Sequence, residues 1–414
     1  MSEKLITKKT KVLVLPSDTS GVSKFRSVDP HLWLEKFYPE EFHIDISYEV
    51  NFNDINFWKQ YDIVHFHRTL VVYENMEQHV KMLKDLGIVV IMDLDDYWLP
   101  GQHHPAHHII IKNDLHKKIV ANLKLADYVT TTTQIFANEI NKHNKNTCVL
   151  PNAINPEEKQ FTPTPEKSDR IRIGWLGGSS HARDLSILDG MVSQIKAAGL
   201  IDKVQFVVCG FDLRGNVTIY NKDTGEETQR KIRPEESVWF QYEKIFTDNY
   251  DIVSPEYKAH LLKFENKEYD NIANEPYRRV WTKPVTSYAS NYNLFDIALA
   301  PVEENIFNKV KSQLKVIEAG FHKKALVATN FGPYQIDLVN AYERGGEINL
   351  NGNAFLVDSI KNHKFWGKHL IKMIENPELI ETLATNLHNT VKDKYSAEAV
   401  SKLRREFYLS VVNK

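Results

Sequence analysis

The chain has 414 residues, which is too long for one ordinary hydrophobic core and suits two domains. Its 52 Lys and Arg residues nearly balance its 54 Asp and Glu residues. Proteins that bind the phosphates of nucleic acid usually have more basic than acidic residues. A nucleic-acid partner is therefore not favoured. No stretch approaches the roughly 20 apolar residues of a membrane-spanning helix, and residues 1–10 lack the apolar core of a signal peptide.

These features predict a cytoplasmic protein, with peripheral membrane contact left open. The two cysteines, Cys148 and Cys209, are too few for a disulfide framework. Both lie in apolar runs, so we expect buried free thiols.

Apolar runs of strand length alternate with amphipathic helical stretches, which predicts βαβ units and parallel sheets. In the first half, the expected strands are residues 11–16, 42–48, 61–67, 88–93, 127–133 and 147–150. Residues 151–169 are rich in Pro, Thr, Glu and Lys and predict a linker. A second series of strands is expected at residues 171–176, 204–209, 294–300 and 324–329.

A more polar insert, at about residues 211–292, interrupts the second series. Two short strands around residues 222–226 predict a β-hairpin, and the rest of the insert predicts helix. We expect an α/β protein with two Rossmann-like domains that face each other across a cleft. The domains are residues 1–155 and 170–395, and a C-terminal helix at residues 396–414 returns to the first domain.

A glycine-rich turn follows the strand at residues 171–176 and precedes a predicted helix with Leu185, Leu188, Val192 and Ile195 on one face. Glycines let the backbone approach an anion, and a helix N-terminus offers unpaired N–H groups. Phosphate binding at this turn is one hypothesis, and a plain tight turn with a serine N-cap is the alternative. The candidate phosphate-binding residues are Gly177, Gly178, Ser179, His181 and Arg183.

A second candidate region follows the strand expected at residues 294–300. A helix is expected from Lys311 to Gly320, with Lys311, Lys315 and Glu318 on one face and Ser312 beside them. Lysines near a helix start suit a diphosphate, and a carboxylate can accept both hydroxyls of a ribose. A solvated Lys-Lys-Glu face is the alternative.

The motifs of this half follow one another as Asp-Ile-Ala-Leu-Ala-Pro, Lys-Ser-x-x-Lys-x-x-Glu, an apolar strand and Gly-x-Tyr. This order resembles the donor site of family 4 glycosyltransferases of the GT-B fold. Residues 151–154, Pro-Asn-Ala-Ile, are similar to the hinge of that family. The resemblance implies a nucleotide-diphosphate sugar as donor, with a UDP-sugar foremost, and Glu318 as the ribose ligand. It also implies retention of the anomeric configuration. Val310 stands where the family has a second glutamate, which leaves the sugar open.

The N-terminal half supplies the other candidates. The loop at residues 16–26 resembles the Gly-rich loop of the family, with Gly21 and Arg26 as acceptor-binding candidates. Asp95 and Asp96 follow a strand at its carboxyl end, where such sheets place functional groups, and together with Lys311 they are the catalytic candidates. His67 is a further acceptor-binding candidate.

Two metal hypotheses are open. Asp93 and Asp95 match the Asp-x-Asp pair of the GT-A fold, but cationic groups at the donor make a metal unnecessary. The histidines at residues 103–108 are expected to be a solvated group rather than a metal cluster. We therefore expect no metal site.

The sequence predicts a metal-independent glycosyltransferase that moves a sugar from a nucleotide-diphosphate sugar to an acceptor hydroxyl, with no cofactor beyond the donor substrate. The acceptor is open among a glycan, a lipid-linked glycan, a protein and a modified phage DNA base. The alternatives are a non-catalytic nucleotide-sugar-binding module and a nucleotide-sugar epimerase of the same fold.

Overall fold

The computed structural model describes residues 8–70, 73–212, 215–220, 224–233, 236–247, 276–343, 345–358 and 364–412. The chain divides into two compact units. The N-terminal unit comprises Met1–Pro156, Asn305–Ile317 and Val391–Lys414, and the C-terminal unit comprises Glu157–Glu304 and Glu318–Thr390.

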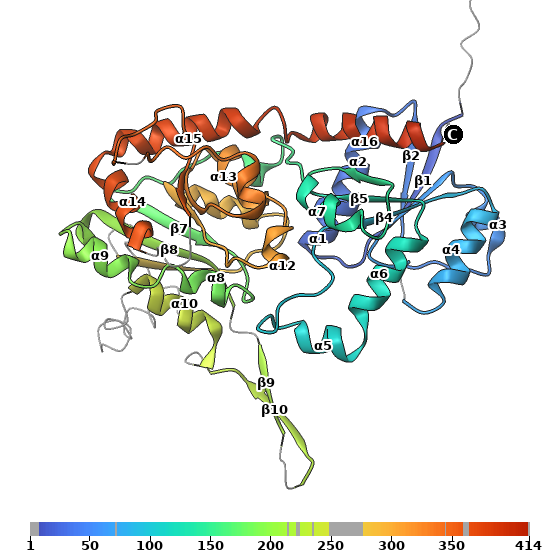
Figure 1. The fold of residues 1–414 in the computed structure, drawn as a ribbon, viewed down its shortest axis with the longest axis horizontal. Helices are drawn as coiled ribbons and strands as arrows, with labels where there is room; N and C mark the ends of the chain where they lie inside the picture. The colour runs from blue at the N-terminus through green and yellow to red at the C-terminus, as the bar shows by residue number, and fades with distance from the viewer. Residues whose placement is uncertain are drawn as a thin grey trace, which may run out of the picture. The chain divides into compact units, whose positions relative to one another are not determined.

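The described part of the N-terminal unit contains a sheet of six parallel strands in the order β2-β1-β3-β4-β5-β6 (Figure 1). The strands are β1 (Thr10–Leu15), β2 (Phe42–Ile46), β3 (Ile63–His67), β4 (Val89–Leu94), β5 (Tyr128–Thr131) and β6 (Thr147–Val149). The helical elements are α1 (Gly21–Ser23), the π-helical turn η1 (Lys24–Val28), α2 (Asp29–Phe37), α3 (Ile55–Trp58), α4 (Met76–Asp85), α5 (His107–Lys112), α6 (Leu115–Leu125), α7 (Gln134–Ile140), α12 (Ile306–Lys309) and α16 (Ala397–Val412).

Alternate strand residues bury on opposite faces of this sheet, as the two-residue period of a strand requires. On one face, Val12, Val14 and Ile63 pack with Leu34 of α2 and Tyr408 of α16. The other face packs against α4, α6 and α7; its buried residues include Leu13, Val64, Phe66, Met92, Val80, Leu83, Leu123 and Phe136. The C-terminal helix α16 therefore completes the core of the N-terminal unit.

The C-terminal unit contains a second sheet of six parallel strands among its described residues, in the order β11-β8-β7-β12-β13-β14. The strands are β7 (Ile171–Leu176), β8 (Val204–Phe211), β11 (Tyr277–Trp281), β12 (Ile297–Ala300), β13 (Ala325–Thr329) and β14 (Phe355–Val357). The helical elements are η2 (Lys159–Phe161), α8 (Ala182–Ser186), α9 (Met191–Ala197), η3 (Ile201–Lys203), α10 (Val238–Thr247), η7 (Tyr288–Leu294), α13 (Leu314–Phe321), η8 (Gly332–Ile336), α14 (Lys364–Glu375) and α15 (Pro377–Val391).

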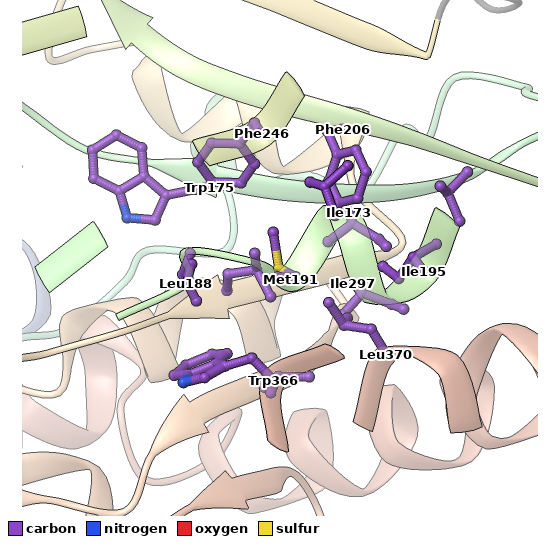
Figure 2. Close-up of a cluster of buried hydrophobic side chains, with 14 of the residues drawn as sticks. Ile173, Trp175, Leu188, Met191, Ile195, Phe206, Phe246, Ile297, Trp366 and Leu370 are labelled. Atoms are coloured by element: carbon purple, nitrogen blue, oxygen red, sulfur yellow. The ribbon is translucent and has the colours of Figure 1, made fainter. Parts of the chain in front are cut away.

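The core of this unit gathers side chains from strands and helices far apart in the sequence. Figure 2 shows Ile173 and Phe206 of the sheet against Met191 and Ile195 of α9, with Trp366 from α14 nearby. Trp366 is completely buried. Such clusters explain why the apolar runs of the sequence identify the central strands.

Several elements differ from the sequence expectations. The short strands β11 and β14 lie at the two edges of the sheet and were not predicted. The helix expected after residue 181 is broken into α8 and α9, because Gly190 takes a left-handed conformation with φ 80°. The predicted linker is partly packed, since Phe161 of η2 is buried.

The hairpin is confirmed by the antiparallel strands β9 (Asn216–Tyr220) and β10 (Glu227–Lys231). Within the rest of the insert, α10 is helical as expected, β11 is a strand instead, and residues 248–275 lie outside the described residues. Cys209 is a buried free thiol as predicted, but Cys148 is only half-buried because it lies on the edge strand β6. No helix in the described ranges is long and apolar enough to cross a membrane.

Candidate functional site

The first cluster of candidate residues lies at the carboxyl ends of three neighbouring strands in the N-terminal unit. Ser17 follows β1, His67 ends β3, and Asp95 and Asp96 follow β4. Strands β1, β3 and β4 are adjacent and parallel, so their following loops emerge at one edge of the sheet. The strand order thereby brings His67 beside Ser17, 50 positions away in the sequence, and beside Asp95, 28 positions away.

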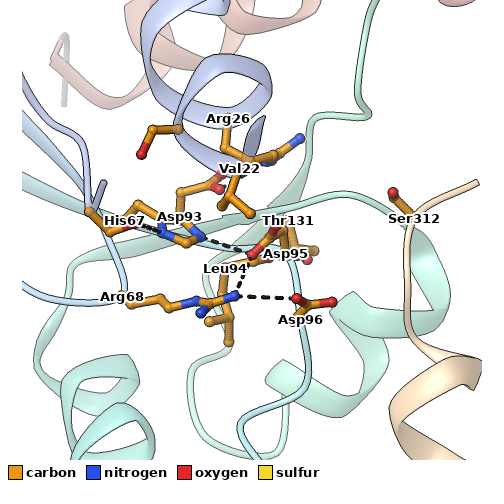
Figure 3. A network of polar contacts seen from close by, with 12 residues as sticks. Val22, Arg26, His67, Arg68, Asp93, Leu94, Asp95, Asp96, Thr131 and Ser312 are labelled. Atoms are coloured by element: carbon orange, nitrogen blue, oxygen red, sulfur yellow. Dashed lines mark hydrogen bonds and ion pairs between the residues drawn. The ribbon is translucent and has the colours of Figure 1, made fainter. Parts of the chain in front are cut away.

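Ser17, His67 and Asp95 form a continuous hydrogen-bonded chain. The Ser17 Oγ lies 2.8 Å from His67 Nδ1, and His67 Nε2 lies 2.9 Å from Asp95 Oδ1. The imidazole is completely buried, the Asp95 side chain is 15% exposed, and Ser17 is exposed. Figure 3 shows His67 and Asp95 pointing toward each other. His67 therefore does not reach an acceptor itself, because both ring nitrogens are engaged.

Arg68 bridges the two consecutive carboxylates. Its Nη2 donates to Asp95 Oδ1 at 3.0 Å and to Asp96 Oδ2 at 3.4 Å (Figure 3). The backbone of Arg68 is in the left-handed region with φ 62°, which is strained for a residue with a side chain. Two hydrogen bonds hold it there, from Arg68 N to Asp93 O and from Asn122 Nδ2 to Arg68 O. Strain held in this way is typical of functional positions.

The two carboxylates differ in their electrostatics. Burial alone would raise the pKa of Asp95, but His67 and Arg68 outweigh it, and the pKa of Asp95 lies well below its ordinary value. Burial and the neighbouring Asp95 raise the pKa of Asp96, against the opposing effects of Arg68 and Lys311. A pair of carboxyl groups whose pKa values are pushed apart is a feature of acid–base sites.

Arg26 was predicted from the sequence to bind the acceptor, but its side chain is buried and does not face an acceptor. Its guanidinium pairs with Asp93 and donates from Nη1 to Leu150 O and Asn152 Oδ1. Burial alone would lower the pKa of Arg26, but Asp93 more than reverses this and raises it. Arg26 is buried because η1 packs against β1 and β3, and its side chain reaches Asp93 on β4. Asp93 also accepts from Thr130 Oγ1, so the Asp-x-Asp hypothesis would require a carboxylate that is already fully engaged.

The sequence placed residues 305–317 in the second domain, at residues 170–395. The contacts of Asn305–Ile317 instead group this segment with the N-terminal unit. Val310 is completely buried in the apolar cluster that contains Leu94 and Met92. Asn152 Nδ2 donates to Ser312 Oγ at 3.1 Å, and Gln313 Nε2 donates to Tyr395 Oη at 2.8 Å. These three contacts anchor the segment.

The helix expected from Lys311 begins instead at Leu314, as α13. Lys311 lies between α12 and α13, with its Nζ 4.9 Å from the ring centre of Phe307. Val310 is the C-cap of α12 and is completely buried, and residues 311–313 separate it from α13. Lys311 therefore does not share a helical face with Lys315 and Glu318, which both lie on α13.

Glu318 forms the centre of a second cluster, in the C-terminal unit. The carboxylate is 4% exposed and accepts hydrogen bonds from Tyr288 Oη on Oε1 and from Tyr292 Oη, at 3.0 Å, on Oε2. Burial and Glu318 raise the pKa of both tyrosines well above the ordinary value, so both are protonated donors at neutral pH. The ring of His322 stacks on Tyr292 with 5.3 Å between ring centres.

The glycine-rich turn after β7 is held by Tyr242 of α10. The Tyr242 hydroxyl lies 2.9 Å from Ser179 O and accepts from His181 N at 3.0 Å. A Cβ on Gly177 would lie 2.4 Å from the Trp175 ring, so packing requires this glycine, whereas a Cβ on Gly178 would meet open space. The serine-capping alternative is wrong, because His181 occupies the N-cap position of α8 without a side-chain cap.

The basic candidates near this turn have acidic partners. His181 Nδ1 lies 2.7 Å from Asp184 Oδ2, and Arg183 pairs with Glu303 at 2.7 Å while its side chain stays 53% exposed. Arg183 can therefore still meet a ligand. Gly21 is the first residue of α1, which Ser20 caps. In the ranges that the structure describes, no group of three or more His, Cys, Asp or Glu side chains could hold a metal ion.

Sequence reasoning missed four residues that the structure places in these clusters: Ser17, Arg68, Tyr288 and Tyr292. Ser17 stands in the loop that the resemblance pointed to, and Arg68 directly follows a candidate histidine. Ser17 and Arg68 each lie just after the end of a strand, and this position was the sequence signal that could have identified them. Nothing local marks the tyrosines, which meet Glu318 from 26 and 30 positions away.

No protein-family model matches the sequence, and no curated protein matches it. Solved structures match the fold over nearly the whole chain. Sucrose-phosphate synthase from Thermosynechococcus elongatus matches with a TM-score of 0.57 and 12% identity over 98% of this chain and 99% of that chain. HepE from Anabaena, in complex with UDP and glucose, matches with a TM-score of 0.57 and 11% identity over 98% of this chain and 100% of that chain.

A complex of HepE with UDP-glucose matches with a TM-score of 0.53 and 10% identity over 97% of this chain and 99% of that chain. At these identities the likeness is one of fold. Together with the two parallel sheets, it shows that the chain has the α/β GT-B fold, built from two Rossmann-like units.

Proposed function

We propose that this protein is a glycosyltransferase that moves a sugar from a nucleotide-diphosphate sugar, with a UDP-sugar foremost, to the hydroxyl of an acceptor. The observation that carries the proposal is the buried Glu318 carboxylate, oriented by two tyrosine hydroxyls in a unit of the GT-B fold. A carboxylate that is held in place can accept hydrogen bonds from the two hydroxyls of a ribose. The similar HepE structures contain UDP and UDP-glucose, which supports the choice of nucleotide.

The proposal assigns the donor to Gly177, Gly178, Ser179, His181, Arg183 and Glu318 of the C-terminal unit. Lys311, Ser312 and Lys315, which the sequence motif also suggests as donor ligands, belong to the segment Asn305–Ile317 of the N-terminal unit. The cationic members would offset the charge that develops on the leaving diphosphate, which is the largest electrostatic demand of the transfer. The acceptor is assigned to Gly21, Asp95 and Asp96, while Arg26 and His67 position their neighbours from buried sites.

Retention of the anomeric configuration belongs to the same proposal and rests on the resemblance to family 4. Independence from metal also belongs to it and rests on the cationic side chains among the donor candidates, which would neutralise the diphosphate. A panel of nucleotide sugars, assayed for release of free nucleotide diphosphate with and without chelator, tests the function and the metal requirement together. Release with at least one donor, unchanged by chelator, is the expected result. NMR of the product then reports the anomeric configuration.

One observation favours a second candidate, a nucleotide-sugar-binding module without activity. Val310 occupies the position of the family's second glutamate and is completely buried, so the chain has a core residue where the family has a sugar ligand. Calorimetric binding of a nucleotide sugar, with no nucleotide release in the presence of any acceptor extract, would establish the module and overturn the enzyme.

A further inference from the structure

The hydrogen-bonded chain Ser17–His67–Asp95 has a defined direction. Asp95 is ionised, because its pKa lies well below the ordinary value, so it accepts the proton of His67 Nε2. In the imidazole tautomer that donates from Nε2, Nδ1 is the acceptor, and the Ser17 hydroxyl at 2.8 Å is its donor. The competing acceptor of that hydroxyl, Asp18 Oδ2, is farther away at 3.1 Å.

Ser17 is the solvent-exposed member of the hydrogen-bonded series Ser17–His67–Asp95. His67 is completely buried, and Asp95 is mostly covered by its contacts with His67 and Arg68. When the Ser17 hydroxyl donates to His67 rather than to Asp18, the lone pairs of its oxygen can accept from a hydroxyl that arrives from solvent. Ser17 is thus an acceptor at the surface, backed by a buried base and an ionised carboxylate.

We propose that Ser17 receives the proton of the acceptor hydroxyl and that His67 and Asp95 form the proton relay behind it. The inference rests on the proposed glycosyl transfer. As the acceptor oxygen bonds to the anomeric carbon, the bond from that carbon to the diphosphate breaks and the diphosphate leaves with its electron pair. The acceptor proton moves to Ser17 Oγ, and the proton of Ser17 moves to His67 Nδ1. The resulting imidazolium is stabilised by the Asp95 carboxylate and later loses its proton to solvent. The route does not depend on which face of the sugar is attacked.

Arg68 is a positioning residue for the relay. Its guanidinium binds the same Asp95 oxygen that accepts from His67, and it reaches Asp96 with the same Nη2. The left-handed backbone of Arg68 places this side chain directly after His67, next to the carboxylate that the relay needs ionised. The Arg68 guanidinium therefore supports the relay, because it helps to lower the pKa of Asp95 and holds the Asp95 carboxylate beside His67.

The test compares Ser17→Ala with Ser20→Ala. Ser20 lies in the same loop, but its hydroxyl donates to Asp18 rather than to His67, so it is a matched control. We expect Ser17→Ala to lower kcat by about 10²–10⁴-fold, the usual contribution of acid–base catalysis. The KM for the donor should change by no more than about twofold, because donor binding does not involve the relay. Ser17→Thr keeps a hydroxyl and should recover most of the lost kcat.

A second measurement uses the wild-type protein without substrate. The ¹⁵N NMR signals of His67 should show a protonated Nε2 and an unprotonated Nδ1, and the Nδ1 signal should shift in Ser17→Ala but not in Ser20→Ala. The opposite tautomer overturns the relay. So does a Ser17→Ala kcat equal to that of wild type, or a fall in Ser20→Ala as large as that in Ser17→Ala. A wild-type protein that releases no nucleotide from any donor overturns the proposed function instead, which separates the two failures.

Discussion

The Arg26 guanidinium and the Asp93 carboxylate form a two-point ion pair inside the N-terminal unit, with Nε–Oδ1 at 2.9 Å and Nη2–Oδ2 at 2.7 Å. Neither side chain is more than 1% exposed. Through Nη1, the same guanidinium reaches Leu150 O and Asn152 Oδ1. One arginine therefore joins the π-helical turn η1 to strand β4 and to the residues after β6, directly beneath the loops that carry the candidate site.

Breaking this pair should be costly. Arg26→Ala leaves a buried carboxylate without its partner, and we expect a loss of about 3–5 kcal/mol in the free energy of unfolding. The half-buried pair Arg405–Glu41, at the surface of the same unit, is the control, and Arg405→Ala should cost about 0–1 kcal/mol. Urea unfolding measures both variants. Equal losses in the two would mean that the buried pair does not organise the unit.

Neutralising Asp95 and neutralising Asp96 should change the free energy of unfolding in opposite directions. The folded-state pKa of Asp95 is depressed, so Asp95 stabilises the fold above the unfolded value near 3.8 and this contribution is lost as the pH falls further. The folded-state pKa of Asp96 is raised, so its ionised form costs stability at neutral pH. Asp95→Asn should therefore destabilise at pH 7, whereas Asp96→Asn should stabilise.

Both effects should shrink below the unfolded pKa near 3.8, where the carboxyl groups are protonated in the unfolded chain. The Asp96 effect should be the smaller one, because its side chain is 36% exposed and water screens the repulsion. Urea midpoints of wild type and the two variants at pH 7 and at low pH provide the comparison. Two variants that change stability in the same direction at pH 7 would contradict the assignment.

Glu318 should be the main determinant of nucleotide affinity. In Glu318→Ala, the ribose hydroxyls lose a charged acceptor, and calorimetry should show UDP binding weakened by about 1.5–3 kcal/mol, or roughly 10- to 150-fold. Tyr292→Phe removes one donor but keeps the carboxylate, so its effect should be smaller. Glu381→Ala, at an exposed position of α15, is the control and should bind UDP as wild type does. Unchanged affinity in a folded Glu318→Ala protein would remove the donor site from this position.

His322 should make the protein sensitive to mild acid. Burial, with a contribution from Lys324, lowers the pKa of His322 from 6.5 to about 4. Because the unfolded chain binds this proton at higher pH than the folded chain, stability should fall as the pH drops from about 6.5 to about 4, by on the order of 3 kcal/mol. His322→Phe keeps a ring against Tyr292 and should flatten this dependence, while His108→Asn, at an exposed position, should not. A His322→Phe protein with the same slope as wild type would locate the acid sensitivity elsewhere.

The sequence by itself determined the fold class and most of the central strands. Runs such as Val12–Leu15 and Ile171–Leu176 are apolar because both faces of a parallel sheet are covered, so composition alone reveals them. The loop after β4 was identified because parallel strands present their carboxyl ends at one edge. The turn after β7 was identified by its glycines and the helix that follows, and the loop after β1 by its resemblance to family 4. The edge strands β11 and β14 were missed since they are short and lie outside the most strongly apolar runs.

The tertiary structure alone decided what the candidate residues contact. A sequence does not distinguish an arginine that faces an acceptor from Arg26, which pairs with a carboxylate 67 positions away. The same holds for Val310, which is buried in the core of the N-terminal unit, the unit to which Asn305–Ile317 belongs. The Ser17–His67–Asp95 chain exists because the order β1-β3-β4 aligns three strand ends. Strand order depends on packing across the whole unit, and local sequence preferences do not encode it.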